Sequence, residues 1–198
     1  MKFGTAVTVT LTDYERAQIL PHCKSAMIGG SSYIFKSKEK RLEELQENQL
    51  VGLTSEAAFC KWAEPLGSGG IERWLQQRCR MNLDKFNGDA GFDCELASGI
   101  KIDVKSSEPK GECGEFSGLT YHLTQCRYKT FPHVAYVQCL AKRQSDEFQV
   151  PKEVLIFGWL WGHELSGRTD EKNFEGWSAR CDSTRDIQEL RNVSGSGG

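Results

Sequence analysis

The stretch GFDCELASGIKIDVKSS, residues 91–107, decides the fold class of this chain. Apolar and polar residues alternate along it on both sides of Ala-Ser-Gly, residues 97–99, a pattern typical of a β-hairpin. Because side chains of a strand alternate between its two faces, Phe92, Cys94 and Leu96 are expected on one face. The return strand adds three apolar residues to that face: Ile100, Ile102 and Val104. The polar residues of both strands are expected on the opposite face.

The register of this hairpin concentrates charge on its polar face. With a three-residue loop, Glu95 pairs with Lys101 and Asp93 lies opposite Asp103, whereas a shift by one residue would mix the two faces. Two carboxylates directly opposite each other destabilise a hairpin. A hard divalent cation such as Mg²⁺ turns the same pair into a binding site. The alternative interpretation is a solvated hairpin face on which Glu95 and Lys101 form a surface pair.

The segments on either side of the hairpin predict a single α/β domain. Alternation at residues 5–12 indicates a strand, and the apolar runs 133–141 and 154–161 are typical of central strands covered on both faces. Helical patterns with good propensity cover residues 39–49, 53–63, 71–81 and 183–192, and a short helix is expected from Trp161 to Leu165. The rest of the segment after Gly167 is expected to be irregular. We expect one domain over residues 1–193, with 194–198 as a flexible tail or cloning remnant.

Glu56 lies in the second predicted helix, for which Thr54 is a suitable N-cap. The positions three, four and seven residues after Glu56 are Phe59, Cys60 and Ala63, so its carboxylate lies on an apolar stripe. A buried charge is unfavourable unless it is paired or binds a metal. The alternative is a partly hydrated glutamate in the first helical turn, which the helix dipole favours.

Taken together, these segments resemble the PD-(D/E)XK nuclease superfamily, the restriction-endonuclease-like fold. That family's pattern is a helical Glu, an Asp that starts a hairpin, and (D/E)-x-K on the return strand. In LVGLTSEAAFCKWAEPLG, residues 50–67, and in the hairpin, the matching residues are Glu56, Asp93 and the tripeptide Asp103-Val104-Lys105. A glycine before the helix and the lead GDAGFD into the hairpin also match. The resemblance covers about residues 50–161.

The resemblance implies a central mixed β-sheet flanked by helices and a nuclease that hydrolyses phosphodiester bonds with Mg²⁺, for which Mn²⁺ substitutes. Asp93, Asp103 and the Val104 carbonyl would hold metal, Glu56 would hold a second ion, and Lys105 would position the attacking water. DNA is the favoured substrate and endonuclease the favoured activity. The alternatives are an exonuclease or RNA-directed nuclease of the same fold, or a non-cleaving nucleic-acid-binding module.

Two departures from the family pattern concern positions outside the charged cluster. Phe92 replaces the proline of the family name, a variation that leaves the chemistry intact. Some exonuclease-like members carry Gln-x-x-x-Tyr on a later helix, but Gln125 and Tyr128 are one residue too close for that motif. Assignment to that subgroup is therefore not supported.

The composition is typical of a folded domain. Apolar residues make up 38% of the chain and charged residues 26%, which excludes a highly charged disordered chain. The chain has neither an apolar run of the ~20 residues that a membrane span needs nor a signal-peptide pattern, so a cytoplasmic protein is expected. The net charge of −2 does not by itself indicate nucleic acid, because an acidic metal site offsets a basic binding face. Expected partners are nucleic acid, DNA above all, and a second copy in a homodimer, with no membrane.

The eight cysteines, the histidines and the tryptophans have functional and structural interpretations. The cysteines form no C-x-x-C pair, which favours reduced, buried thiols over zinc or disulfides. The histidines considered as active-site groups are His122, His133 and His163, for which ordinary hydrogen bonding is the simpler interpretation. The tryptophans considered for base stacking are Trp159, Trp161 and Trp177, for which packing in the core is simpler.

Overall fold

The computed structural model describes residues 6–26, 38–83, 92–108, 120–123, 131–164, 167–171, 174–180 and 184–195. Its elements are, in chain order, β1 (Val7–Thr10), α1 (Asp13–Ala26), α2 (Lys38–Trp62), the 3₁₀ helix η1 (Glu64–Leu66), α3 (Gly70–Leu83), β2 (Cys94–Glu95), β3 (Lys101–Ser107), β4 (Thr120–Leu123), β5 (Val134–Ala141), β6 (Glu153–Trp161), the 3₁₀ helix η2 (Gly162–Glu164), β7 (Gly167–Glu171), β8 (Phe174–Arg180) and α4 (Glu189–Gly195). Among these residues no helix combines the length and the apolar character that crossing a bilayer requires.

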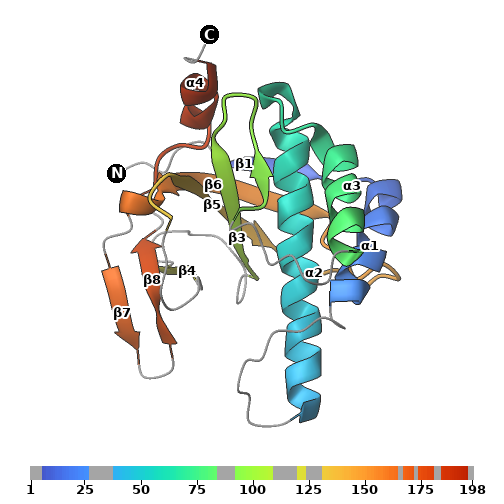
Figure 1. Ribbon diagram of the computed structural model, residues 1–198. Helices are drawn as coiled ribbons and strands as arrows, with labels where there is room; N and C mark the ends of the chain where they lie inside the picture. The colour runs from blue at the N-terminus through green and yellow to red at the C-terminus, as the bar shows by residue number, and fades with distance from the viewer. Residues whose placement is uncertain are drawn as a thin grey trace.

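A five-stranded mixed sheet forms the centre of the fold, in the order β1-β6-β5-β3-β2 (Figure 1). The neighbours β3 and β5 are parallel, and every other pair is antiparallel. Every residue of β5 is buried, and β6 is buried along most of its length. The two continuous apolar runs of the sequence are thus central strands, as predicted, and the α/β class is confirmed.

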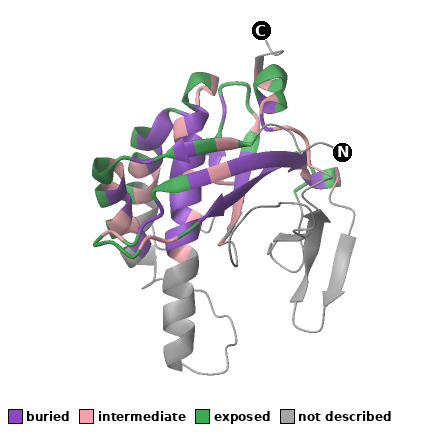
Figure 2. Ribbon diagram, turned by 180° about the vertical axis from the view of Figure 1, so that it is seen from behind, coloured by how far each residue is buried: buried purple, intermediate pink, exposed green. Residues whose placement is uncertain are grey.

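The helices α1, α2 and α3 form one layer on this sheet. Helix α2 packs directly on β3, β5, β6 and β1, while α1 and α3 pack against α2 (Figure 1). The largest buried cluster fills the space between α2 and the sheet face that carries Ile102, Val104, Ala135 and Val137. Figure 2 shows these buried residues along the central strands and on α2. The opposite sheet face carries separate small apolar clusters, one of which contains Tyr136.

Helix α2 is one continuous helix over the two segments for which the sequence predicted separate helices. Thr54 is therefore not an N-cap. Its hydroxyl donates within the helix to the carbonyl of Leu50 at 2.5 Å, and the Ser55 hydroxyl donates to the carbonyl of Val51 at 2.8 Å. Gly52 also lies inside α2 instead of preceding it. Glu56 is consequently a mid-helix residue, which removes the alternative of a hydrated first-turn glutamate.

The hairpin forms as predicted near its turn and departs from the prediction farther out. Glu95 pairs with Lys101, and Cys94 pairs with Ile102. The Asp93 N–H also donates to the Ile102 carbonyl, at 2.7 Å. Two residues thus oppose one, which is a β-bulge. Phe92 packs with the Tyr136 cluster on the other face of the sheet from Cys94. The prediction that Phe92 shares the face of Cys94 is wrong, because the bulge reverses the alternation.

The outer edge of β6 is covered by both ends of the described chain. Strand β1 pairs with residues 153–156, and beyond it Trp159 exchanges two backbone hydrogen bonds with Arg185, at 3.1 and 2.9 Å. A Cβ atom at Gly158 would lie 2.2 Å from the Thr184 hydroxyl, so only glycine allows this close approach.

Several smaller elements differ from the predictions. The sequence did not predict α1, nor a second, three-stranded sheet of order β4-β8-β7 that occupies part of the segment expected to be irregular. The expected short helix after β6 is the 3₁₀ helix η2. Helix α4 starts later than predicted and runs to Gly195, so the expected tail at 194–198 begins inside a helix.

Candidate functional site

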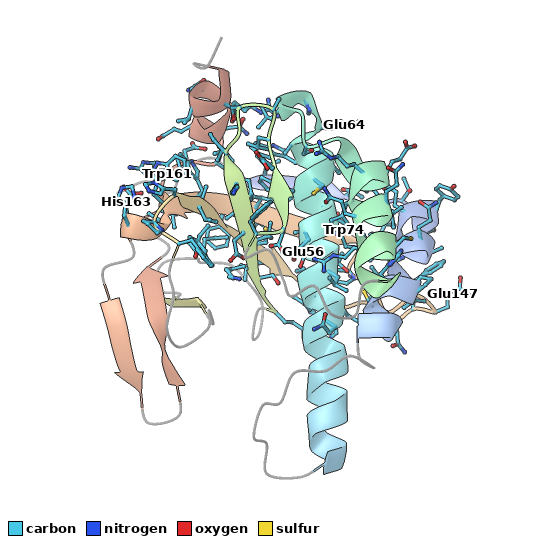
Figure 3. All side chains as sticks on the ribbon, in the orientation of Figure 1. Glu56, Glu64, Trp74, Glu147, Trp161 and His163 are labelled. Atoms are coloured by element: carbon cyan, nitrogen blue, oxygen red, sulfur yellow. The ribbon has the colours of Figure 1, made fainter. Side chains whose placement is uncertain are left out.

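Glu56 projects from the C-terminal third of α2 toward α3, with 12% of its side chain exposed (Figure 3). Its Oε2 atom accepts a hydrogen bond from the Trp74 indole N–H at 3.2 Å and a charged hydrogen bond from the Arg78 guanidinium. The predicted apolar stripe around it exists: Phe59, Cys60 and Ala63 are all buried. Glu56 is therefore a partly buried carboxylate with an ionic partner.

Asp93 lies at the edge of the sheet, where β2 has ended. Its Oδ2 atom accepts a hydrogen bond from the backbone N–H of Val104 at 2.7 Å, and its Oδ1 atom lies 3.7 Å from the same Arg78 nitrogen that binds Glu56. One carboxylate thus contacts both the partner of the helical glutamate and the backbone of the D-x-K tripeptide. The bulge makes this possible, because it moves Asp93 out of the regular register.

Asp103 and Lys105 are neighbours on one face of β3. Asp103 is nearly covered, with 4% of its side chain exposed, and its Oδ1 atom lies 2.5 Å from the Lys105 ammonium, which is 22% exposed. In the parallel pair of β3 and β5, Asp103 is opposite Tyr136 and Lys105 is opposite Gln138. The side chains of all four therefore belong to one face of the sheet.

The four predicted residues meet at one edge of the sheet but not on one face. Ile102 and Val104 point into the cluster under α2. Because side chains of a strand alternate between its faces, Asp103 and Lys105 point away from that helix. Glu56 approaches from the helix side, and Asp93 lies between the two groups. The expectation that Asp93 and Asp103 face each other as a cross-strand pair is wrong. The bulge sets both Asp93 and Cys94 opposite Ile102, so Asp93 does not lie opposite Asp103.

The charges of this edge act on each other. Burial raises the pKa of the Asp93 carboxyl well above its usual range, and the negative charges of Glu56 and Asp103 raise it further, against the opposing effect of Lys105. Burial lowers the pKa of Lys105, but Asp103 and Asp93 outweigh it, so that this pKa is raised overall. Three carboxylates thus share an edge whose positive charges come from Arg78 and Lys105.

The oxygen donors of this edge fit a hard divalent cation in chemistry, and their present arrangement is that of a closed ionic network. Within the described ranges, no group of three or more His, Cys, Asp or Glu side chains is arranged to hold a metal ion. Arg78 lies between two of the carboxylates and Lys105 binds the third. The N–H and C=O of a strand residue point to the same side, so the Val104 carbonyl faces the same edge as Asp93. Carboxylate and carbonyl oxygens there match the preference of Mg²⁺.

Arg78 is the residue of this edge that the sequence predictions missed. It lies on α3, four residues after Trp74, and its guanidinium carbon is 5.7 Å from the centre of that indole ring. Both side chains contact Glu56. The available signal was their i, i+4 spacing on a predicted helix, which places a cation and an indole on one face.

The other candidates lie away from this edge or outside the described residues. His163 is exposed at the end of β6, where Figure 3 shows it far from Glu56, and its ring contacts the Pro132 carbonyl. Trp159 is buried, which agrees with a packing role. The cysteines described as free thiols are Cys23, Cys60, Cys79, Cys94 and Cys139. The motif positions Gln125 and Tyr128, and the side chains of His122 and Trp177, lie outside the described part of the chain.

Comparisons of the chain with models of protein families, with characterised proteins and with solved structures gave no match. Its function is therefore inferred from the residues and contacts described above.

Proposed function

We propose that this protein is a divalent-metal-dependent nuclease that hydrolyses phosphodiester bonds, with DNA as substrate and internal cleavage as the favoured mode. Glu56, Asp93, Asp103 and Lys105 are the residues that carry the activity. An exonuclease or an RNA-directed nuclease would use the same four residues, so the substrate arms of the experiment below distinguish these forms.

The position of Asp93 is the observation that carries this proposal. Its two oxygens reach in two directions, one toward the Arg78 nitrogen that binds Glu56 and the other to the backbone N–H of Val104. Residues that are far apart in the sequence, on α2 and on β3, are thereby connected through one partly buried carboxylate. Three carboxylates there face two cationic side chains, Arg78 and Lys105, and this excess of negative charge favours a role in binding a cation.

Each residue has a distinct role in the proposed site. Asp93, Asp103 and the Val104 carbonyl would hold the ion, and Glu56 would hold a second one directly or through water. A bound divalent ion polarises the phosphate and lowers the pKa of a bound water. Lys105 lies beside Asp103 and exposes part of its side chain, so its ammonium can orient the attacking water and offset negative charge on the phosphate.

The test is cleavage of circular and linear DNA, single- and double-stranded, and of RNA, in Mg²⁺, Mn²⁺, Ca²⁺ or EDTA. We expect cleavage in Mg²⁺ and Mn²⁺, with 5′-phosphate and 3′-hydroxyl products. Ca²⁺ should support binding with little turnover, because its looser coordination positions water poorly. Loss of circular substrate identifies internal cleavage. Full activity in excess EDTA would contradict the proposal.

A non-cleaving nucleic-acid-binding module is the second candidate, and one observation favours it. All three carboxylates have cationic partners in the present arrangement, as in an ionic network that only stabilises the fold. Binding of DNA or RNA that is equally tight with and without divalent ions, and no cleavage in any of them, would favour this candidate. Calorimetry with Mn²⁺ distinguishes the two directly, because the module has no need of the ion.

A further inference from the structure

Arg78 is the basic residue described at this edge that contacts two carboxylates. Its side chain is 21% exposed, and it forms ion pairs with both Glu56 and Asp93. The indole of Trp74 contacts the same Glu56 oxygen, and its ring lies beside the guanidinium. The guanidinium therefore stands between the two carboxylates of the helix side of the proposed site.

A divalent cation and the Arg78 guanidinium compete for these oxygens. An ion bound by Glu56 and Asp93 would repel the guanidinium and replace the hydrogen bond that Arg78 makes with Glu56. Arg78 would then exchange its ion pairs with these two carboxylates for other contacts, next to the place where phosphate is bound. A guanidinium recognises phosphate through two parallel N–H donors, so a nucleic-acid phosphate is its natural replacement partner.

We propose that Arg78 is a phosphate-binding residue that Glu56 and Asp93 hold in the metal-free protein and release when a divalent ion takes their oxygens. This inference rests on the proposed function and adds a substrate contact that depends on the metal. It links metal binding to nucleic-acid binding: the ion makes Arg78 available, and the phosphate keeps it away from the carboxylates.

The experiment compares wild-type protein with Arg78→Met, which keeps an unbranched apolar stem and removes the charged guanidinium group. Calorimetry with Mn²⁺ should show about tenfold tighter binding by Arg78→Met, because no charge-assisted hydrogen bond has to be broken. Binding of a labelled DNA duplex is then measured at several salt concentrations, once in Ca²⁺ and once in EDTA. Arg78→Met should reduce the slope of log K against log salt by about 0.9 in Ca²⁺, one phosphate contact, and leave it unchanged in EDTA.

Arg73→Met is the matched control, since Arg73 is an exposed arginine on the same helix and forms no ion pair described with the cluster. It should leave Mn²⁺ affinity unchanged and should alter DNA binding equally in Ca²⁺ and in EDTA. Arg78→Lys keeps the charge and loses the two-pronged geometry. It should raise Mn²⁺ affinity by less than Arg78→Met and keep the salt slope, which tests the inference even if Arg78→Met folds poorly.

Two results would overturn the inference. Weaker or unchanged Mn²⁺ binding by Arg78→Met and Arg78→Lys would show that Arg78 holds the carboxylates in place for the ion. An equal loss of DNA affinity by Arg78→Met in Ca²⁺ and in EDTA would show that its phosphate contact does not depend on metal. Wild-type protein that binds no divalent ion contradicts the proposed function itself, whereas metal binding and cleavage without any effect of Arg78 contradict this inference alone.

Discussion

The Asp93 carboxylate accepts a hydrogen bond from the backbone N–H of Val104 at 2.7 Å. Because the donor is backbone, the contact does not depend on which side chain occupies position 104. The contact does depend on the bulge, which takes Asp93 out of the regular register, so that its side chain reaches the backbone of Val104. A local irregularity of the hairpin therefore sets the position of the central carboxylate of the proposed site.

Asp93→Asn should stabilise the metal-free protein while it abolishes cleavage. The pKa of Asp93 is raised in the folded protein by burial and by Glu56 and Asp103. Its favourable contribution to folding is thus fully present below the unfolded pKa of ~3.9 and is lost as pH rises through the folded pKa. Asparagine can keep accepting from Val104 without the charge. Urea unfolding in EDTA should show a gain at pH 7.5 that fades in mild acid; a less stable variant at pH 7.5 would argue against this.

Asp103→Asn and Lys105→Ala should separate the proposed metal ligand from the residue proposed to position the attacking water. Asp103→Asn removes a charge from the proposed ligand set, so Mn²⁺ affinity and cleavage should fall together. Lys105→Ala removes no ligand and should keep or increase Mn²⁺ affinity, while the single-turnover rate falls by about 10²-fold or more. Glu95→Gln, in the same hairpin but on its exposed side, is the control and should change neither. Cleavage by Lys105→Ala at the wild-type rate would make the D-x-K assignment wrong.

Lys105→Ala should also lower the stability of the metal-free protein. Asp103 is nearly covered, and its ion pair with Lys105 is lost in the variant, which leaves a buried charge with less compensation. Added Mn²⁺ should restore the melting temperature, because the ion supplies the missing positive charge. If Mn²⁺ stabilises wild type and variant equally, the ion does not bind at Asp103.

Gln138→Met should stabilise the protein by about 1 kcal/mol. Gln138 is fully buried on β5 opposite Lys105, and among the described residues neither its amide oxygen nor its amide nitrogen has a hydrogen-bond partner. A buried polar group without a partner costs ~1–3 kcal/mol, and methionine fills a similar volume without that cost. Chemical denaturation measures the difference. Tyr136→Phe, on the same face, should by contrast lower stability, because the Tyr136 hydroxyl accepts a hydrogen bond from the Phe131 N–H at 3.2 Å. A loss of stability in Gln138→Met would indicate that the amide is satisfied by bound water.

Glu15→Gln should weaken the junction between the start of α1 and the end of α2, mainly above pH ~4.3. Glu15 accepts from the Thr12 N–H at 2.7 Å and from the Lys61 ammonium at 2.8 Å. Burial raises its pKa, but these contacts outweigh burial and lower the pKa overall. The stabilising contribution is therefore present above the unfolded pKa and is lost as pH falls through the folded pKa. We expect a loss of ~0.5–1 kcal/mol at neutral pH.

The control for this prediction is Glu147→Gln, a change at an exposed glutamate of the β5–β6 loop. The difference in stability between the two variants should shrink as pH falls through the folded pKa of Glu15, which lies below its usual range. A difference that does not change with pH would mean that Glu15 acts through packing and not through its charge.

The sequence predicted those features that depend on local periodicity. The runs 133–141 and 154–161 are apolar at most positions of both strand faces, so their burial on both faces followed directly. The turn at residues 97–99 likewise fixed the pairing of Glu95 with Lys101. These signals are complete within about ten residues, and tertiary contacts do not alter them.

Features that depend on contacts between distant segments were not predictable in the same way. Helix α2 continues through residues 50–54 because its buried face packs on the sheet, although Gly52 and Thr54 suggested a boundary. The bulge at Asp93 needs Phe92 to pack beside Tyr136, a residue more than forty positions away in the sequence. Arg78 joins the site only once α3 lies against α2.

The cover over the outer edge of β6 has a consequence for self-association. An uncovered strand edge exposes backbone donors and acceptors that a second chain can pair with. Here β1 and the segment at Arg185, from opposite ends of the described chain, each pair with part of that edge. Removal of either piece would leave a largely buried, apolar strand open to intermolecular pairing. Trimming the chain at either end would therefore be expected to produce aggregation rather than a smaller monomer.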